Sequence, residues 1–272
     1  MPAKSPAKPV HCCVAFSRAS ERPCCLKTVW LDSSAMSDVF QDPAEAWESR
    51  LVWDFFEKQR DGVFVECGAN HPVNFNQTFF LEQQGWSGLL IELNPELCAL
   101  LRLYRPNSRT IEAAVGSPAQ AGEVEVRLAQ AHGHASLRPD SGLRLSDRKV
   151  RVPLRTLDSV LAESGLARID FLSIDVEGLE LDVLLGFDLK KWKPRLIFIE
   201  DEFENYSKHK HLVARGYKLV RRTSYNNWYV PRETPVSVFS LSTTRQLIRL
   251  CRKMWLGPVT GVWKNVRAKF RR

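Results

Sequence analysis

The chain has 272 residues, of which 44% are hydrophobic and 26% are charged, so its composition excludes wholesale disorder, collagen and coiled coil. This length suits one large domain, or one domain with appendages, and not two full-sized domains. No stretch approaches the roughly 18 to 20 apolar residues of a membrane-spanning helix. The short apolar run after Val10 makes a poor secretory signal, so we expect a cytoplasmic protein.

The net charge of +8 is concentrated at the two ends of the chain. Residues 240–272 hold nine basic and no acidic side chains, and residues 1–35 carry a net charge of +3, which leaves −4 between them. A basic groove through the main domain is therefore not indicated, which argues against nucleic acid as a partner. The seven cysteines show no zinc-like spacing and are typical of reduced thiols, so we predict no metal site from them.

Composition divides the chain into three parts. Residues 1–35 are rich in Pro, Ala, Ser and Lys without periodicity, and we expect a disordered leader there. That leader is either a linker or lies upstream of a true start at Met36. Residues 36–239 form the predicted main domain, and residues 240–272 a basic amphipathic tail.

The first half of the main domain predicts helices that alternate with short apolar strands. A helix near its start places Trp47, Leu51 and Phe55 on one face, with Val52 and Phe56 beside them. Strands are then predicted over residues 63–67, 88–92 and 110–115, and helices over residues 76–84 and 95–105.

The second half continues the alternation after a polar stretch that reaches Arg151. We predict, in chain order, a side hairpin over 123–128, a helix over 156–163 capped by Thr156, a strand over 170–175, a helix over 179–185, a strand over 195–200, and an antiparallel pair over 217–220 and 227–230. Because most strands are apolar without alternation, they indicate an α/β fold whose mostly parallel sheet has an antiparallel end.

Three carboxylates, Glu66, Glu92 and Asp175, stand at the predicted carboxyl ends of strands, beyond which open α/β sheets bind their ligands. Gly68 allows a tight turn after the first strand, and Glu92, 26 residues after Glu66, is placed to bind a ribose diol. A loop with one glycine and an acidic neighbour disfavours a pyrophosphate. It favours the sulfonium of S-adenosylmethionine over NAD.

More specific patterns surround these carboxylates: Phe64 to Asn70 with Thr78, Ile91 to Pro95, Leu154 to Leu161, and Ile169 to Glu180, which contains Ile-Asp-Val-Glu-Gly. Together they resemble the FkbM-type methyltransferase family over roughly residues 60–202. The sequence departs from the family pattern at Cys67 and His71-Pro72. Ser173 stands where the family commonly has Lys, so no role of that Lys is transferred here.

The resemblance implies a class I, Rossmann-like fold over the methyltransferase domain, 36–239, that binds S-adenosylmethionine and methylates a hydroxyl oxygen. It implies the following roles: Glu66, Gly68 and Asn70 at the methionine end, Glu92 at the ribose, Asn94 at the adenosine, Ser136 approaching from the variable loop, and Asp175 facing the methyl group with Glu177 beside it.

The chemistry asks mainly for alignment of acceptor, methyl group and sulfur. Asp175 is the predicted general base or orients the hydroxyl; alternatively it only contacts the cofactor or caps the next helix. His71, His132 and His134 are alternative bases on loops. Mg²⁺ held by Asp175 with Glu200 and Asp201 is conceivable but not favoured, and no metal ligand is assigned.

The tail over residues 240–272 spaces Leu247, Leu250, Cys251 and Met254 as a helix would, with basic residues between them. Such a helix could bind the inner surface of a membrane, pack on the domain, or contact nucleic acid, and the last is the least favoured.

The acceptor is expected to be a small molecule or glycan: a hydroxyl on a sugar, a glycolipid precursor or a small metabolite. The competing interpretations are a non-catalytic cofactor-fold module and an RNA or protein methyltransferase. An Asn-Pro-Pro-Tyr-like amine site and a cysteine nucleophile after the fourth strand are both missing, so oxygen is favoured over nitrogen or carbon.

Overall fold

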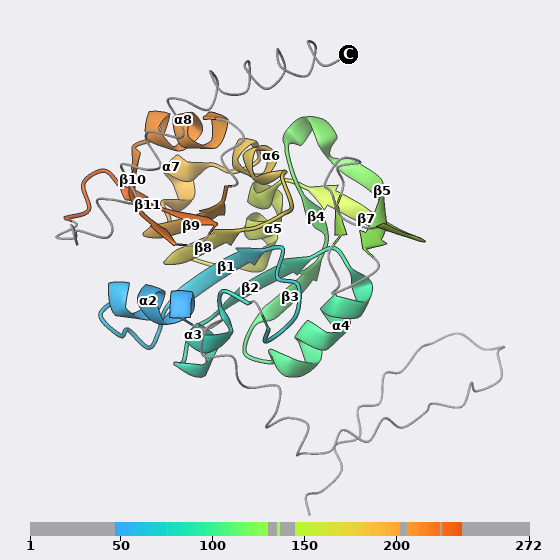
Figure 1. Ribbon diagram of the computed structural model, residues 1–272, viewed down its shortest axis with the longest axis horizontal. Coiled ribbons are helices and arrows are strands. Elements are labelled where there is room, and N and C mark those ends of the chain that lie inside the picture. Colours follow the sequence, from blue (N-terminus) through green and yellow to red (C-terminus); the bar gives the residue numbers. More distant parts are fainter. Residues whose placement is uncertain are drawn as a thin grey trace, which may run out of the picture. The chain divides into compact units, whose positions relative to one another are not determined.

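The computed structural model describes residues 47–74, 76–129, 135–136, 145–201, 206–223 and 225–235 (Figure 1). The chain divides into two units, Met1–Asp38 and Val39–Arg272, and every described residue belongs to the second. The predicted leader and tail, 1–35 and 240–272, lie outside the described residues. Within the described part, no helix is long and apolar enough to cross a membrane.

The main sheet has seven strands in the order β10-β11-β9-β8-β1-β2-β3. Its members are β1 (Val63–Cys67), β2 (Ser87–Glu92), β3 (Arg109–Glu112), β8 (Phe171–Ile174), β9 (Leu196–Glu200), β10 (Tyr217–Thr223) and β11 (Asn226–Pro231). Five neighbouring strands of this sheet, β9, β8, β1, β2 and β3, are parallel. Strand β11 runs antiparallel to both β9 and β10. The predicted mostly parallel sheet with an antiparallel end is therefore confirmed.

A second sheet, in the order β4-β7-β5-β6, branches from the first. It consists of β4 (Ala114–Val115), β5 (Gly122–Ala129), β6 (Ala135–Ser136) and β7 (Leu145–Arg155), with a short 3-10 helix, η1 (Pro118–Gln120), between β4 and β5. The single strand predicted over 110–115 is wrong, because the chain leaves the main sheet at Ala113 and continues in the second one. The predicted side hairpin corresponds to β5, which pairs along its length with β7.

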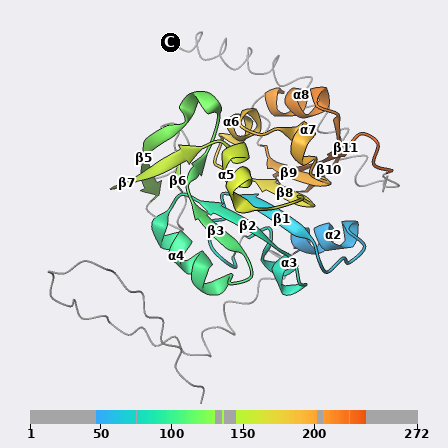
Figure 2. The same cartoon turned by 180° about the vertical axis from the view of Figure 1, so that it is seen from behind.

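Helices cover both faces of the main sheet (Figures 1 and 2). One core contains side chains of α5 (Leu157–Ser164), α6 (Glu180–Leu185), α7 (Leu189–Trp192) and α8 (Ser207–Ala214). The opposite core contains side chains of α2 (Trp47–Phe55), α3 (Phe79–Gln83) and α4 (Pro95–Tyr104). Thr156 caps α5 as predicted, because its side chain accepts a hydrogen bond from the amide of Ser159.

The buried face of α2 agrees with the prediction at Val52 and differs from it at Trp47. Trp47 is 39% exposed, whereas Glu48, Ser49 and Val52 are buried. The reason is a polar contact: Ser49 Oγ donates to the carbonyl of Gln77 at 2.9 Å, so this face of α2 packs on the loop that follows β1. Helix α2 thus covers the main sheet near the carboxyl ends of the strands that carry the predicted carboxylates.

Candidate active site

The strand order reverses between β1 and β8, which is where doubly wound sheets form their ligand crevice. Parity along the strands shows which face the polar side chains occupy. Glu66 is two residues beyond the core residue Phe64, Glu92 two beyond Leu90, and Glu200 two beyond Phe198. All three carboxylates therefore lie on the face covered by α2, α3 and α4, at the carboxyl edge of the sheet.

Gly68 brings the loop after β1 against the end of β8. Its φ is +81°, and a Cβ at this position would overlap the carbonyl oxygen of Asp175. The amide of Asp175 in turn donates to the carbonyl of Cys67 at 3.0 Å. The glycine is thus required both by the backbone conformation and by the close approach of the two loops.

Gly68→Ala is expected to destabilise the fold by at least about 2 kcal/mol, because a left-handed alanine and a backbone clash add together. Urea unfolding measures the change. Gly165→Ala is the matched control, since Gly165 also has a positive φ but no atom near its absent Cβ. Equal losses in the two variants would show that the contact with Asp175 contributes nothing.

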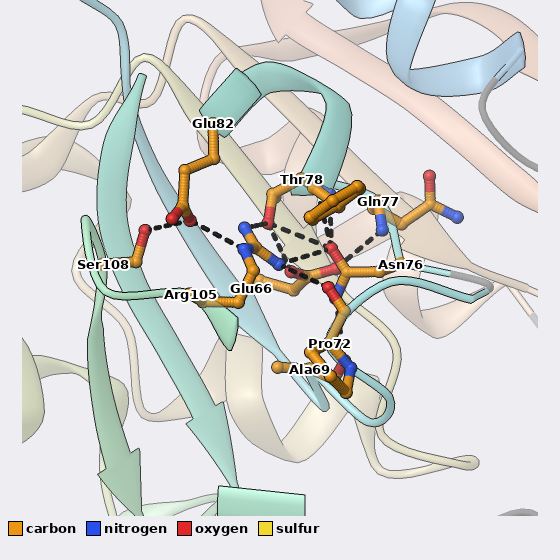
Figure 3. A network of polar contacts seen from close by, with 10 residues as sticks. Glu66, Ala69, Pro72, Asn76, Gln77, Thr78, Glu82, Arg105 and Ser108 are labelled. Atoms are coloured by element: carbon orange, nitrogen blue, oxygen red, sulfur yellow. Dashed lines mark hydrogen bonds and ion pairs between the residues drawn. The ribbon is translucent and has the colours of Figure 1, made fainter. Parts of the chain in front are cut away.

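The Glu66 carboxylate binds the loop between β1 and α3. Oε1 accepts from the amide of Gln77 at 2.9 Å, and Oε2 accepts from Thr78 Oγ1 at 2.6 Å (Figure 3). Burial raises the pKa of Glu66, although the charge of Arg105 and these hydrogen bonds lower it. Both carboxylate oxygens of Glu66 therefore hold the loop between β1 and α3 in place. A contact between Glu66 and a methionine amino group stays a prediction.

Arg105, the residue that follows α4, is completely buried and binds the same loop between β1 and α3. Its guanidinium donates to Glu82 Oε2 at 2.7 Å, Asn76 Oδ1 at 2.9 Å and Thr78 Oγ1 at 2.9 Å (Figure 3). A further bond reaches the carbonyl of Pro72 at 3.2 Å. The sequence interpretation missed Arg105, because a single arginine at a helix end gives no sign that it is buried.

Glu92 joins the loops that follow β1 and β2. Oε2 accepts from the amide of Asn70 at 2.9 Å and Oε1 from the amide of Asn94 at 2.8 Å. Asn94 also caps α4, since its side chain accepts from the amide of Glu96. Asn70 has a φ of +49°, and its Oδ1 is buried without a hydrogen-bond donor among the described residues. Such an atom needs an explanation, and a bound ligand is one.

Asp175 and Glu200 directly follow the paired residues Ile174 and Ile199 of the neighbouring strands β8 and β9, so their carboxyl groups form a neighbouring pair. Burial, followed by the charge of Glu200 and the hydrogen bond with it, raises the pKa of Asp175 well above its ordinary value. Glu177 and Glu180 raise it further. Two neighbouring carboxyl groups do not both ionise easily, so Asp175 holds its proton more tightly than an isolated aspartic acid does.

The turn after Asp175 is tight and is built by acidic side chains. Glu177 adopts a φ of +55° and Gly178 one of +94°. Glu180 Oε1 accepts from the amide of Gly178 at 2.7 Å, which closes the turn, and Glu180 is itself buried. Glu177 therefore lies in the turn that follows Asp175, and its predicted catalytic role stays a prediction.

Ser136 lies in β6 of the second sheet, where its backbone pairs with Arg127. Its side chain is not among those described, so its approach to a cofactor stays a prediction. His132 and His134 lie outside the described residues. His71 Nδ1 accepts from the amides of Val73 and Asn74, which gives this ring a turn-forming role.

Among the residues described, no group of three or more His, Cys, Asp and Glu side chains is arranged to hold a metal ion. Glu48 adds a carboxyl from α2, and its Oε2 accepts from Asn226 Nδ2 at 2.9 Å and Gln77 Nε2 at 3.3 Å. Asn226 lies opposite Glu200 in the sheet register. The carboxyl edge of the main sheet therefore carries an acidic crest, which favours a cationic ligand. This crest consists of Glu48, Glu66, Glu92, Asp175 and Glu200.

The strand order, the glycine turn and the acidic crest together define a Rossmann-like methyltransferase fold. The chain matches the Methyltransferase FkbM domain over residues 66–219. It therefore belongs to the FkbM methyltransferase family.

Individual relatives match short segments of the chain. AMB antimetabolite synthetase AmbE of Pseudomonas aeruginosa is 56% identical over 45 residues, which cover 16% of this chain and 2% of AmbE. Methyltransferase sdnD of Sordaria araneosa is 47% identical over 53 residues, which cover 16% of this chain and 20% of sdnD. The matched segments thus span a small part of both relatives.

Solved structures resemble the chain only distantly. A precorrin-6y C5,15-methyltransferase from Geobacter metallireducens is 11% identical with a TM-score of 0.36, covering 67% of this chain and 86% of that one. The N-terminal domain of human METTL16 in complex with SAH is 12% identical with a TM-score of 0.39, covering 70% of each chain.

Proposed function

We propose that the protein transfers a methyl group from S-adenosylmethionine to a hydroxyl oxygen. The observation that supports this most strongly is the Asp175–Glu200 carboxyl pair: Asp175 ends the strand at the switch point of the sheet, with its backbone against the Gly68 turn, and Glu200 ends the next strand. A site that combines a cofactor loop with a proton acceptor of raised pKa is suited to activating an alcohol.

The described residues fit S-adenosylmethionine. The donorless Oδ1 of Asn70 offers an acceptor to the ammonium of the methionine end. The carboxylate of Glu92 is held by two backbone amides, at the strand end where a ribose diol is bound in related sheets. The acidic crest suits a positively charged methyl donor and disfavours a dinucleotide pyrophosphate.

When bound, S-adenosylmethionine supplies an electrophilic methyl group whose bond to sulfur breaks as the bond to the acceptor oxygen forms, with the electron pair remaining on sulfur. The residues of this chain supply orientation and a place for the proton. The Asp175–Glu200 pair accepts the hydroxyl proton. Glu177 stays close enough to influence the charge of the pair.

The acceptor that we favour is a hydroxyl on a sugar, a glycolipid precursor or another small metabolite. The clustered carboxyl and amide groups of Glu48, Asn226 and Glu200 support a hydroxyl-rich molecule and argue against a polyanion such as RNA. A cytoplasmic location, with contact to the membrane surface through residues 240–272, belongs to the same proposal.

Titration calorimetry tests the cofactor. We expect S-adenosylmethionine to bind and NAD not to bind. Glu92→Gln is expected to weaken binding at least about tenfold, since hydrogen bonds to a charged group are worth about 1.5 to 3 kcal/mol. Glu112→Gln is the matched control, because Glu112 pairs with Glu92 in register on the neighbouring strand and is bound to Arg102. Absence of any heat with S-adenosylmethionine would favour a non-catalytic module.

The acceptor class is tested by incubating the protein with methyl-labelled S-adenosylmethionine and a cell extract, followed by separation into lipid, glycan, RNA and protein. Label in an alkali-stable ether within the glycan or lipid fraction is the expected result. Label in RNA or protein would contradict the proposed acceptor while leaving the cofactor assignment intact.

A further inference from the structure

Lys208, in the first turn of α8, touches both sides of the proposed active site. Its Nζ lies 3.1 Å from Glu180 Oε2, 3.2 Å from Asp201 Oδ1 and 3.0 Å from the carbonyl oxygen of Glu200. An ammonium group has three N–H donors, and here each has an acceptor. The Lys208 side chain is only 13% exposed, so these contacts are largely buried and are not a surface ion pair.

One of these contacts reaches the turn that carries Asp175. Glu180 uses its other oxygen, Oε1, to accept from the amides of Val176 at 3.4 Å and Gly178 at 2.7 Å. Val176 follows Asp175 directly in the chain. The orientation of the Asp175 side chain therefore depends on a turn that is closed by Glu180, and Glu180 is held from outside by Lys208.

The other two contacts reach the end of β9. Lys208 binds the backbone of Glu200 itself and the side chain of Asp201, the next residue. Asp201 is held further by Asn227 Nδ2 at 3.1 Å. A single ammonium group thus contacts the end of β9 directly and the turn after β8 through the side chain of Glu180.

The charge of Lys208 is secured by its neighbours. Burial alone would lower the pKa of Lys208, but the charges of Glu180 and Asp201 outweigh that effect and raise it. Truncating a buried, paired charge leaves its partners uncompensated, which makes such a group sensitive to substitution.

We propose that Lys208 is a positioning residue, which sets the spacing of the Asp175–Glu200 pair by tying the turn after β8 to the end of β9. This inference rests on the proposed function, because it assigns a purpose to the carboxyl pair. Glu200 is the last residue of β9, but Asp175 lies one residue beyond β8, where strand pairing alone does not fix how closely its side chain approaches Glu200.

Charged groups lie on the elements next to the Asp175–Glu200 pair. The turn after β8 contributes Glu177 and Glu180, and the end of β9 contributes Asp201. Helix α8 contributes Lys208 and also His209, whose ring bonds to the Tyr229 hydroxyl. Strand β10 contributes Arg222, which donates to the carbonyl of Asp201 at 2.8 Å. A change in titration must be interpreted against all of them.

The test is a carboxyl ¹³C NMR titration of Asp175 in the full chain, with Asp175→Asn used to assign the signal. Lys208→Met is expected to lower the titration midpoint of Asp175 by about one pH unit or more, because the hydrogen bond and repulsion from Glu200 are lost. Loss of a positive charge alone would raise the midpoint, so the sign of the shift separates positioning from plain electrostatics.

Lys208→Arg, which retains the charge and the donors, is expected to restore most of the wild-type midpoint. Lys210→Met is the control, since Lys210 is exposed on the same helix. Should Lys208→Met fail to fold, the smaller and polar Lys208→Gln is titrated instead. An unchanged or raised midpoint in the variant without the ammonium overturns the proposal. The titration uses the protein without S-adenosylmethionine. The proposal for Lys208 can therefore be overturned while S-adenosylmethionine still binds, and binding can be absent while the Lys208 proposal holds.

Discussion

Asp175→Asn is expected to slow methyl transfer roughly 10²- to 10⁴-fold, the usual contribution of a positioned general base. Asparagine keeps the size of the side chain and a hydrogen bond to Glu200, but it cannot accept the hydroxyl proton. Affinity for S-adenosylmethionine is expected to stay within about threefold of the wild type, since the Gly68 turn contacts the backbone of residue 175 and not its side chain.

The same substitution is expected to stabilise the protein at neutral and alkaline pH. The folded-state pKa of Asp175 is raised, so its favourable contribution is complete below its unfolded pKa and is lost as the pH rises through the folded value. Asparagine removes this loss. The melting temperature of Asp175→Asn should therefore exceed that of the wild type by a few degrees at about pH 8, with little difference at about pH 4.

Transfer of labelled methyl to the fraction that the wild type labels, together with thermal melts across pH, checks both halves of this prediction. Glu200→Gln should also reduce transfer, because it changes the group that shares the proton with Asp175. Asp54→Asn, at an exposed position on α2, is the control and should alter neither quantity. Full transfer activity in Asp175→Asn would refute the role of the pair as base.

The main sheet was predictable because its strands are buried on both faces and therefore apolar without alternation. The change of sheet at Ala113 was not, since β3 and β4 form one continuous pattern in the sequence. Strand β7 was missed although Val150, Val152 and Leu154 alternate with polar residues in it. The intervening charges and Pro153 disguised a half-exposed strand that pairs with β5.

The site was predictable only in part, for a related reason. Glu66, Glu92 and Asp175 could be placed at strand ends from local patterns alone. The buried cations around them could not, because each binds a carboxylate far from it in the sequence: Arg105 binds Glu82 23 residues away, and Lys208 binds Glu180 28 residues away. Glu200 was considered only as a metal ligand, since its contact with Asp175 depends on β8 and β9 being neighbours.

Arg105→Met is expected to destabilise the fold by about 3 to 5 kcal/mol, the usual result of removing one partner from a buried ionic network. Methionine fills a similar volume but leaves Glu82 without its 2.7 Å partner, and it removes the guanidinium donors to Thr78 Oγ1 and Asn76 Oδ1. Urea unfolding at fixed pH measures the loss. Arg102→Met, one turn earlier on α4, is the matched control, because its ion pair with Glu112 is exposed and should be worth at most about 1 kcal/mol.

The pH dependence of this loss identifies which carboxylate Arg105 supports. The positive charge of Arg105 lowers the pKa of Glu66, which burial holds above its ordinary value. Without Arg105 that pKa rises further, so the variant should lose more stability than the wild type as the pH increases from about 5 to 8. A uniform loss across this range would mean that Arg105 acts through Glu82 alone. A loss no larger than that of Arg102→Met would show that the loop after β1 holds Glu66 in place without the buried cation.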